Sequence, residues 1–122
     1  MPEDAGIVGL LAVQRALPLF HCRDAATGMR VLESLHAGGL RAVEFMNRSD
    51  GAIDVFRELA AAAAERLPGM VLGAGTIVDP SSVEAFGAAG SAFIVAPNLD
   101  EQVGRRCAAV GIPWCPGTGT VS

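Results

Sequence analysis

Residues 38–48 read GGLRAVEFMNR, and this stretch combines a helix end, a strand and a polar strand terminus. Gly38 and Gly39 are typical of the point where a helix stops. The apolar residues over 40–45 are typical of a short buried strand, and polar side chains follow it directly. The stretch therefore predicts a helix that leads, through a tight turn, into a strand whose carboxyl end carries polar groups.

The same pattern recurs in both directions from this stretch. A leading helix is expected over 4–16, and strands are expected over 17–20, 40–45, 70–74, 92–95 and 112–115. Crossover helices are expected over 25–37, 50–67, 80–90 and 99–110. Regular alternation of strands with helices is typical of a parallel sheet that has helices outside it.

The length of the repeat favours one α/β architecture over another. The units recur roughly every 20–25 residues, which is close to the pace of a (β/α)8 TIM barrel and short for a doubly wound sheet. A complete barrel needs at least about 200 residues, whereas the sequence has 122. We expect residues 1–122 to form a single incomplete barrel domain with about five parallel strands and four crossover helices. Its first and fifth strands would then have open edges.

The composition argues against several classes of function. Thirteen acidic and nine basic residues give a formal net charge of −4, whereas nucleic-acid binders carry a basic surface. The apolar run over 7–13 is too short to cross a membrane. The three cysteines, Cys22, Cys107 and Cys115, lack the spacing of a zinc site or a disulfide framework. We therefore expect a cytoplasmic protein that binds neither nucleic acid nor a membrane and that holds free thiols.

Polar and conformationally unusual residues lie at the carboxyl end of each of the five predicted strands, or directly after it. They occupy residues 21–23, 44–48, 73–76, 96–98 and 116–120. In parallel α/β folds the carboxyl ends of the strands form the active site. This distribution therefore predicts the rim of an active site.

Glu44 is the residue that points most directly to chemistry. The period of a strand places Val43 and Phe45 on one face and Glu44 on the other, so we expect Glu44 to point into the barrel. A carboxylate there either acts as a general acid and base or forms an ion pair with Arg48 that fixes the strand end. Arg48 in turn either clamps a carboxylate or phosphate with its planar guanidinium or is a solvated arginine of the rim.

The other polar runs are weaker signals. The run GAGT over 73–76 has Val78 where a dinucleotide fingerprint needs its third glycine. It suits a small anionic ligand or forms a structural turn, and the same two interpretations apply to 116–120. His21 and Cys22 are adjacent on a strand and point to opposite faces, so a Cys–His nucleophile is not expected.

Four motifs together resemble those of one enzyme family. The runs 38–48 (GGLRAVEFMNR), 73–78 (GAGTIV), 93–97 (FIVAP) and 116–122 (PGTGTVS) resemble, in order and spacing, the 2-dehydro-3-deoxy-6-phosphogluconate (KDPG) and 4-hydroxy-2-oxoglutarate (KHG) aldolases. The resemblance implies a (β/α)8 barrel, a homotrimer and a class I aldolase that needs neither metal nor cofactor. Such an enzyme cleaves KDPG or 4-hydroxy-2-oxoglutarate to pyruvate and an aldehyde through a Schiff base on a lysine.

The resemblance also implies a role for each matching residue. Glu44 would be the acid and base residue, and Arg48 and Thr76 would hold the pyruvate carboxylate. Pro97 would shape the wall of the pocket beside them.

The sequence departs from the family pattern at three points. Met46 stands where threonine is usual, and Asn98 where glycine or a small apolar residue is usual. The family's Schiff-base lysine belongs to the sixth strand, and all nine basic residues of this chain are arginine. We therefore expect the N-terminal portion of an aldolase, which ends before that strand and is inactive alone.

Two other hypotheses stay open. In the first hypothesis, the chain is a catalytically inactive half-barrel that binds a small 2-oxo acid or self-associates through its open edges. In the second hypothesis, the chain is a different α/β enzyme that acts on a small ligand, such as a phosphate-binding barrel. The four-motif match and the missing late-strand phosphate loops argue against this last hypothesis.

Overall fold

The computed structural model describes residues 6–118 and contains the expected alternation of elements. The helices are α1 (Gly6–Gln14), α2 (Ala25–Ala37), α3 (Ala52–Arg66), α4 (Pro80–Ala88) and α5 (Glu101–Val110). The strands are β1 (Leu19–Phe20), β2 (Ala42–Met46), β3 (Val71–Gly75), β4 (Ile94–Ala96) and β5 (Trp114–Pro116). Every predicted element is present, and each boundary lies within two residues of the one expected from the sequence.

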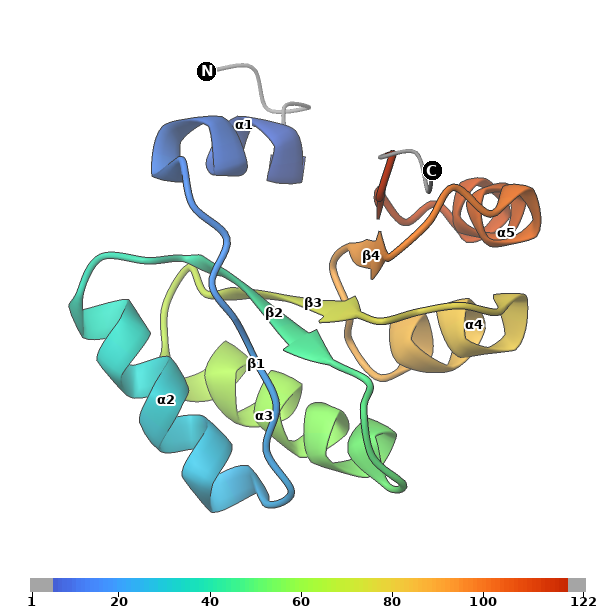
Figure 1. Ribbon diagram of the computed structural model, residues 1–122. Coiled ribbons are helices and arrows are strands. Elements are labelled where there is room, and N and C mark those ends of the chain that lie inside the picture. The colour runs from blue at the N-terminus through green and yellow to red at the C-terminus, as the bar shows by residue number, and fades with distance from the viewer. Residues whose placement is uncertain (1–5, 119–122) are drawn as a thin grey trace.

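The five strands form one parallel sheet in the order β1-β2-β3-β4-β5. Each strand except β5 is followed by a helix that returns the chain to the start of the next strand. Helices α2 and α3 lie on one side of the strands, and α1 lies on the other side (Figure 1). This arrangement confirms the predicted five parallel strands with four crossover helices, and it places β1 and β5 at the edges of the sheet.

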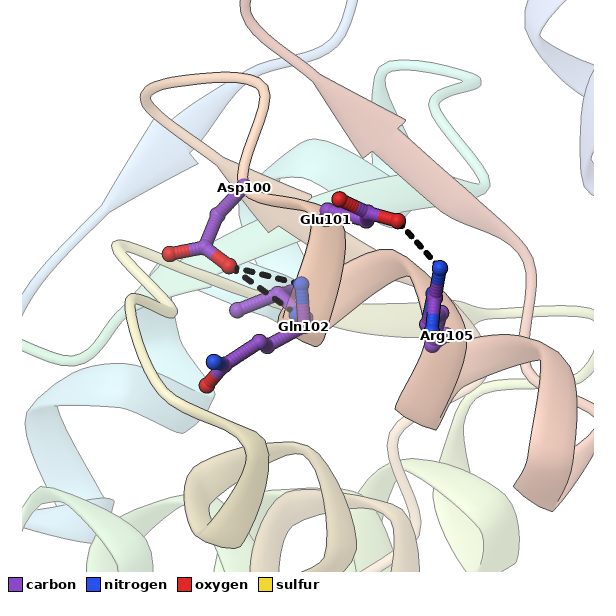
Figure 2. Close-up of polar contacts among 5 residues, drawn as sticks. Asp100, Glu101, Gln102 and Arg105 are labelled. Atoms are coloured by element: carbon purple, nitrogen blue, oxygen red, sulfur yellow. Dashed lines mark hydrogen bonds and ion pairs between the residues drawn. The ribbon is translucent and has the colours of Figure 1, made fainter.

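Aspartates begin three of the crossover helices. Asp24, Asp79 and Asp100 each accept hydrogen bonds from backbone N–H groups two or three residues further along the chain. Figure 2 shows Asp100 at the start of α5, where Arg105 also pairs with Glu101 one turn earlier. These caps satisfy N–H groups that have no partner inside the helix.

The outer face of the sheet packs against the crossover helices. Val43 and Phe45 of β2 are fully buried there, together with Phe56 and Leu59 of α3. This is the face that the strand period assigns to large apolar side chains, so that prediction is confirmed.

The inner face of the sheet is covered by α1 only at its amino end. Ile7 of α1 packs with Ala42 and Phe93 in a separate apolar cluster. The Gln14 side chain accepts hydrogen bonds from the N–H groups of Arg41 and Ala42, and it donates to the Ala42 carbonyl. Helix α1 is thereby fixed at the start of β2, which leaves the carboxyl end of the inner face for a site.

Candidate active site

A cavity of about 240 Å³ lies at the carboxyl ends of β1 to β4. It is lined by Leu19, Glu44, Met46, Arg48, Thr76, Val95, Ala96 and Pro97. The cavity therefore brings together all four residues that were predicted for the site, namely Glu44, Arg48, Thr76 and Pro97. Larger hollows of about 420 and 600 Å³ lie along α2 and α5, away from this cluster.

Glu44 is buried on the inner face of β2, with only 6% of its surface exposed. Burial raises the pKa of the Glu44 carboxyl, and the positive charge of Arg48 opposes that rise without cancelling it. Within the described residues, no Glu44 oxygen lies within ion-pair distance of the Arg48 guanidinium. The structure therefore favours a carboxyl that can hold a proton over a simple Glu44–Arg48 ion pair.

The inner face of β3 has no side chain at two successive positions. A Cβ atom at Gly73 would lie 2.2 Å from the Phe93 ring, and one at Gly75 would lie 1.7 Å from Glu44 Oε2. The glycines of the GAGT run are thus strand residues that make room for neighbours. The sequence suggested a turn here, but the strand continues to Gly75 and the chain turns at Thr76.

Arg48 and Thr76 meet at the mouth of the cavity. Arg48 Nε lies 3.5 Å from Thr76 Oγ1. Thr76 has a φ angle of 58°, a left-handed conformation that is rare for a β-branched residue. Strained backbone of this kind is found mostly at functional sites, where the surrounding structure holds it in place.

Pro97 forms the wall of the cavity next to the loop that follows β5. The Gly117 N–H donates to the Ala96 carbonyl at 2.8 Å, and a Cβ at Gly117 would lie 2.3 Å from the Pro97 carbonyl oxygen. Backbone packing of this closeness requires a glycine. The rest of the 116–122 motif from residue 119 onward lies outside the described residues.

Sequence reasoning missed Cys115 and the apolar side chains of Leu19 and Val95. Burial raises the pKa of the Cys115 thiol, and the negative charge of Glu44 raises it further. Strand alternation along β5 would have put Cys115 on the inner face, opposite to Trp114 in the outer core.

His21 and Cys22 lie beyond β1, which ends at Phe20, so the expectation that they are adjacent on a strand is wrong. Cys22 is buried in the helix-side core, whereas His21 Nδ1 lies 3.2 Å from the Met46 carbonyl oxygen at the edge of the sheet. Neither residue lines the cavity.

Two further observations concern the whole described part of the chain. Within residues 6–118, no group of three or more His, Cys, Asp or Glu side chains is arranged to hold a metal ion. In the same residues, no helix has both the length and the apolar character that crossing a membrane requires.

Comparison with known proteins shows the family to which the chain is related. The family model for KDPG and KHG aldolases matches residues 7–122. The chain is 31% identical over 120 residues to 2-dehydro-3-deoxy-phosphogluconate aldolase of Pseudomonas aeruginosa, which covers 98% of this chain and 53% of the relative.

Solved structures give the same family. The 2-keto-3-deoxy-6-phosphogluconate aldolase of Zymomonas mobilis, solved with 3-phosphoglycerate, is 28% identical and superposes with a TM-score of 0.75 over 86% of this chain and 48% of that one. A KDPG aldolase of Legionella pneumophila, with pyruvate captured as a covalent carbinolamine, is 25% identical, with a TM-score of 0.73 over 82% of this chain and 47% of that one.

The matches also show what share of each relative's length this chain covers. The chain spans about half the length of the curated relatives that it matches. The family model nevertheless covers nearly all of the chain, and the solved relatives share its sheet and helices. The chain belongs to the KDPG and KHG aldolase family.

Proposed function

We propose that this chain provides the carboxylate-binding and proton-transfer part of a class I aldolase site. The substrate class is a 2-oxo acid such as KDPG or 4-hydroxy-2-oxoglutarate, which the complete enzyme cleaves to pyruvate and an aldehyde. The observation that carries the proposal is that Glu44, Arg48, Thr76 and Pro97 line one cavity at the strand ends.

Arg48 and Thr76 are suited to hold the carboxylate of a 2-oxo acid. Their donor atoms lie 3.5 Å apart, so one small anion can contact both. Hydrogen bonds from a guanidinium to a carboxylate are strong because both partners are charged. Leu19, Met46 and Val95 give the same cavity an apolar lining, which suits the methyl group of pyruvate.

Glu44 is suited to move protons at the keto carbon. Loss of water from a carbinolamine requires a proton donor, and cleavage of the C–C bond requires a base for the hydroxyl proton of the aldol. A carboxyl with a raised pKa can serve in both roles, because it exchanges its proton closer to neutral pH than an exposed glutamate does.

The Schiff-base nucleophile of this reaction is a lysine that is not among these 122 residues. The chain by itself is therefore expected to bind a 2-oxo acid without forming a covalent imine. The Legionella relative, in which pyruvate is a covalent carbinolamine, supports the Schiff-base chemistry for the family.

Reduction with borohydride in the presence of pyruvate tests this proposal. We expect no pyruvate adduct on any side chain of the 122-residue chain, as judged by peptide mapping that discounts the α-amino group. A stable adduct on a side chain would contradict the proposed division of the site.

Residues 1–122 are proposed to act as one incomplete barrel domain in the cytoplasm, within a homo-oligomer that is a trimer in the family. A 25% identical chain that belongs to a designed cage of fused symmetric oligomeric domains supports the oligomer.

One observation favours a second function, in which the half-barrel self-associates without catalysis. Strands β1 and β5 are at the edges of the sheet, and Leu19 of β1 is 55% exposed. Open edges of this kind pair readily with other strands. Sedimentation measures the size of the assembly, which both functions expect to exceed one chain. A pyruvate titration distinguishes the two functions, because pairing through the sheet edges requires no pyruvate binding at the cavity.

A further inference from the structure

We infer that Gly75 is a positioning residue for Glu44, because the space left by its missing side chain is the space in which the Glu44 carboxylate lies. The inference deepens the proposed function and rests on it in one respect, namely that Glu44 is the group that transfers protons. The steric relationship itself is independent of that role.

The strand register shows that Glu44 leans along the sheet. Glu44 of β2 is paired with Gly73 of β3, and Met46 is paired with Gly75. Yet the atoms nearest to a Cβ built on Gly75 all belong to Glu44, with Oε2 at 1.7 Å, Cδ at 2.4 Å and Cγ at 2.8 Å. The side chain therefore reaches one inner-face position toward the carboxyl end, next to Thr76.

The Phe93 ring explains why the Glu44 carboxylate does not lie over Gly73, the residue with which Glu44 is paired. The Phe93 ring fills the space above Gly73, with three ring carbons 2.2 to 2.4 Å from a Cβ built there. Phe93 is fully buried and belongs to the apolar cluster under α1. Two consecutive inner-face glycines thus hold two different neighbours, an aromatic ring below and a carboxylate above.

The backbone of Gly75 gives no second reason for a glycine. Gly75 is absent from the described glycines with positive φ and lies within the regular strand β3. Alanine is therefore compatible with the backbone there, and the three atoms that its Cβ would approach most closely all belong to Glu44. Any effect of a methyl group at this position is expected to act through Glu44.

A double-mutant cycle tests the steric relationship. We expect Gly75→Ala to lower Tm on the order of 5 °C in the wild-type chain and to lower it little in a Glu44→Ala background, where the space is free. Gly73→Ala is the matched control, because its Cβ meets Phe93 and should lower Tm equally in both backgrounds. An equal loss for Gly75→Ala in both backgrounds would overturn the inference.

The cycle also covers the case in which Gly75→Ala does not fold. The Gly75→Ala/Glu44→Ala variant is then expected to fold and to unfold near the Tm of Glu44→Ala. Failure of both variants to fold contradicts the inference, since no clash with Glu44 remains in the double variant.

The positioning of Glu44 by Gly75 can also be tested by NMR titration of the Glu44 carboxylate, which does not depend on a measurement of stability. In Gly75→Ala the carboxylate must leave its buried position, so its NMR titration midpoint should move down relative to the wild type. An unchanged midpoint would show that Gly75 does not place the carboxylate. Pyruvate titration of the wild type separates the inference about Gly75 from the proposed function. If pyruvate does not bind but the effect of Gly75→Ala still depends on Glu44, only the proposed function is contradicted. If pyruvate binds but the effect of Gly75→Ala is the same with and without Glu44, only the role of Gly75 is contradicted.

Discussion

Arg48 Nε lies 3.5 Å from Thr76 Oγ1, and this contact joins the loop after β2 to the turn after β3 at the mouth of the cavity. Arginine and threonine both have N–H or O–H groups to donate to an anion. Arg48 is exposed and lies outside both apolar clusters. Substitutions at this pair therefore test binding with little disturbance of the core.

Replacement of Arg48 tests the proposed carboxylate contact. Arg48→Ala is expected to weaken pyruvate binding about 10- to 100-fold, because a hydrogen bond to a charged group contributes about 1.5–3 kcal/mol. Arg57→Ala is the matched control, since Arg57 is an exposed arginine of α3 that pairs with Asp54. Calorimetric titration with pyruvate measures both. Equal affinity of Arg48→Ala and the wild type would contradict the contact.

Thr76 offers a test in which stability and binding change in opposite directions. Thr76→Gly relieves the left-handed conformation of a β-branched residue and is expected to raise the free energy of unfolding by about 1 kcal/mol. The same change removes the hydroxyl and should weaken pyruvate binding. Urea unfolding and pyruvate titration check the two effects. A variant that binds pyruvate as well as the wild type would show that the hydroxyl is not a ligand.

The raised pKa of Glu44 predicts how stability depends on pH. Folding raises this pKa, so the folded state binds the proton more tightly than the unfolded state. The free energy of unfolding should therefore fall as pH rises from the ordinary glutamate value through the folded pKa, and then level off. Glu44→Gln lacks this step. Urea unfolding at a series of pH values gives the difference between the two proteins, and a difference that is constant with pH would contradict the shift.

Asp100 provides a prediction about α5 that is independent of the cavity. Asp100→Ala removes the acceptor for the first N–H groups of α5 and is expected to cost about 1 kcal/mol of stability. Glu101→Ala removes the exposed pair with Arg105 and is expected to cost less, at most about 0.5 kcal/mol. Chemical denaturation ranks the two variants, and the reverse order would show that the cap is not formed.

The order of elements could be predicted from the sequence because local signals agree with the tertiary structure. Asp24 and Asp79 cap the helices that begin at the predicted residues 25 and 80, and Glu44 lies opposite Val43 and Phe45 as strand alternation requires. The candidate site followed from the same rule, because side chains after neighbouring parallel strands come together at one edge of the sheet.

The details that could not be predicted depend on contacts between strands. The sequence shows glycines at Gly73 and Gly75, but only the positions of Phe93 and Glu44 reveal that the glycines make room for side chains. The left-handed φ of Thr76 likewise has no local sequence signal, since a β-branched residue disfavours it.

Titration of the wild-type chain with pyruvate, followed residue by residue by NMR, tests whether the cavity at the strand ends binds a 2-oxo acid. We expect pyruvate to shift the signals of Glu44, Arg48, Thr76 and Ala96, which line the cavity at the strand ends. We also expect fast, reversible binding without a covalent imine, because the chain contains no lysine. Shifts confined to another part of the molecule, such as the hollow beside Trp114, or no shifts at all, would contradict a pyruvate site at the strand ends.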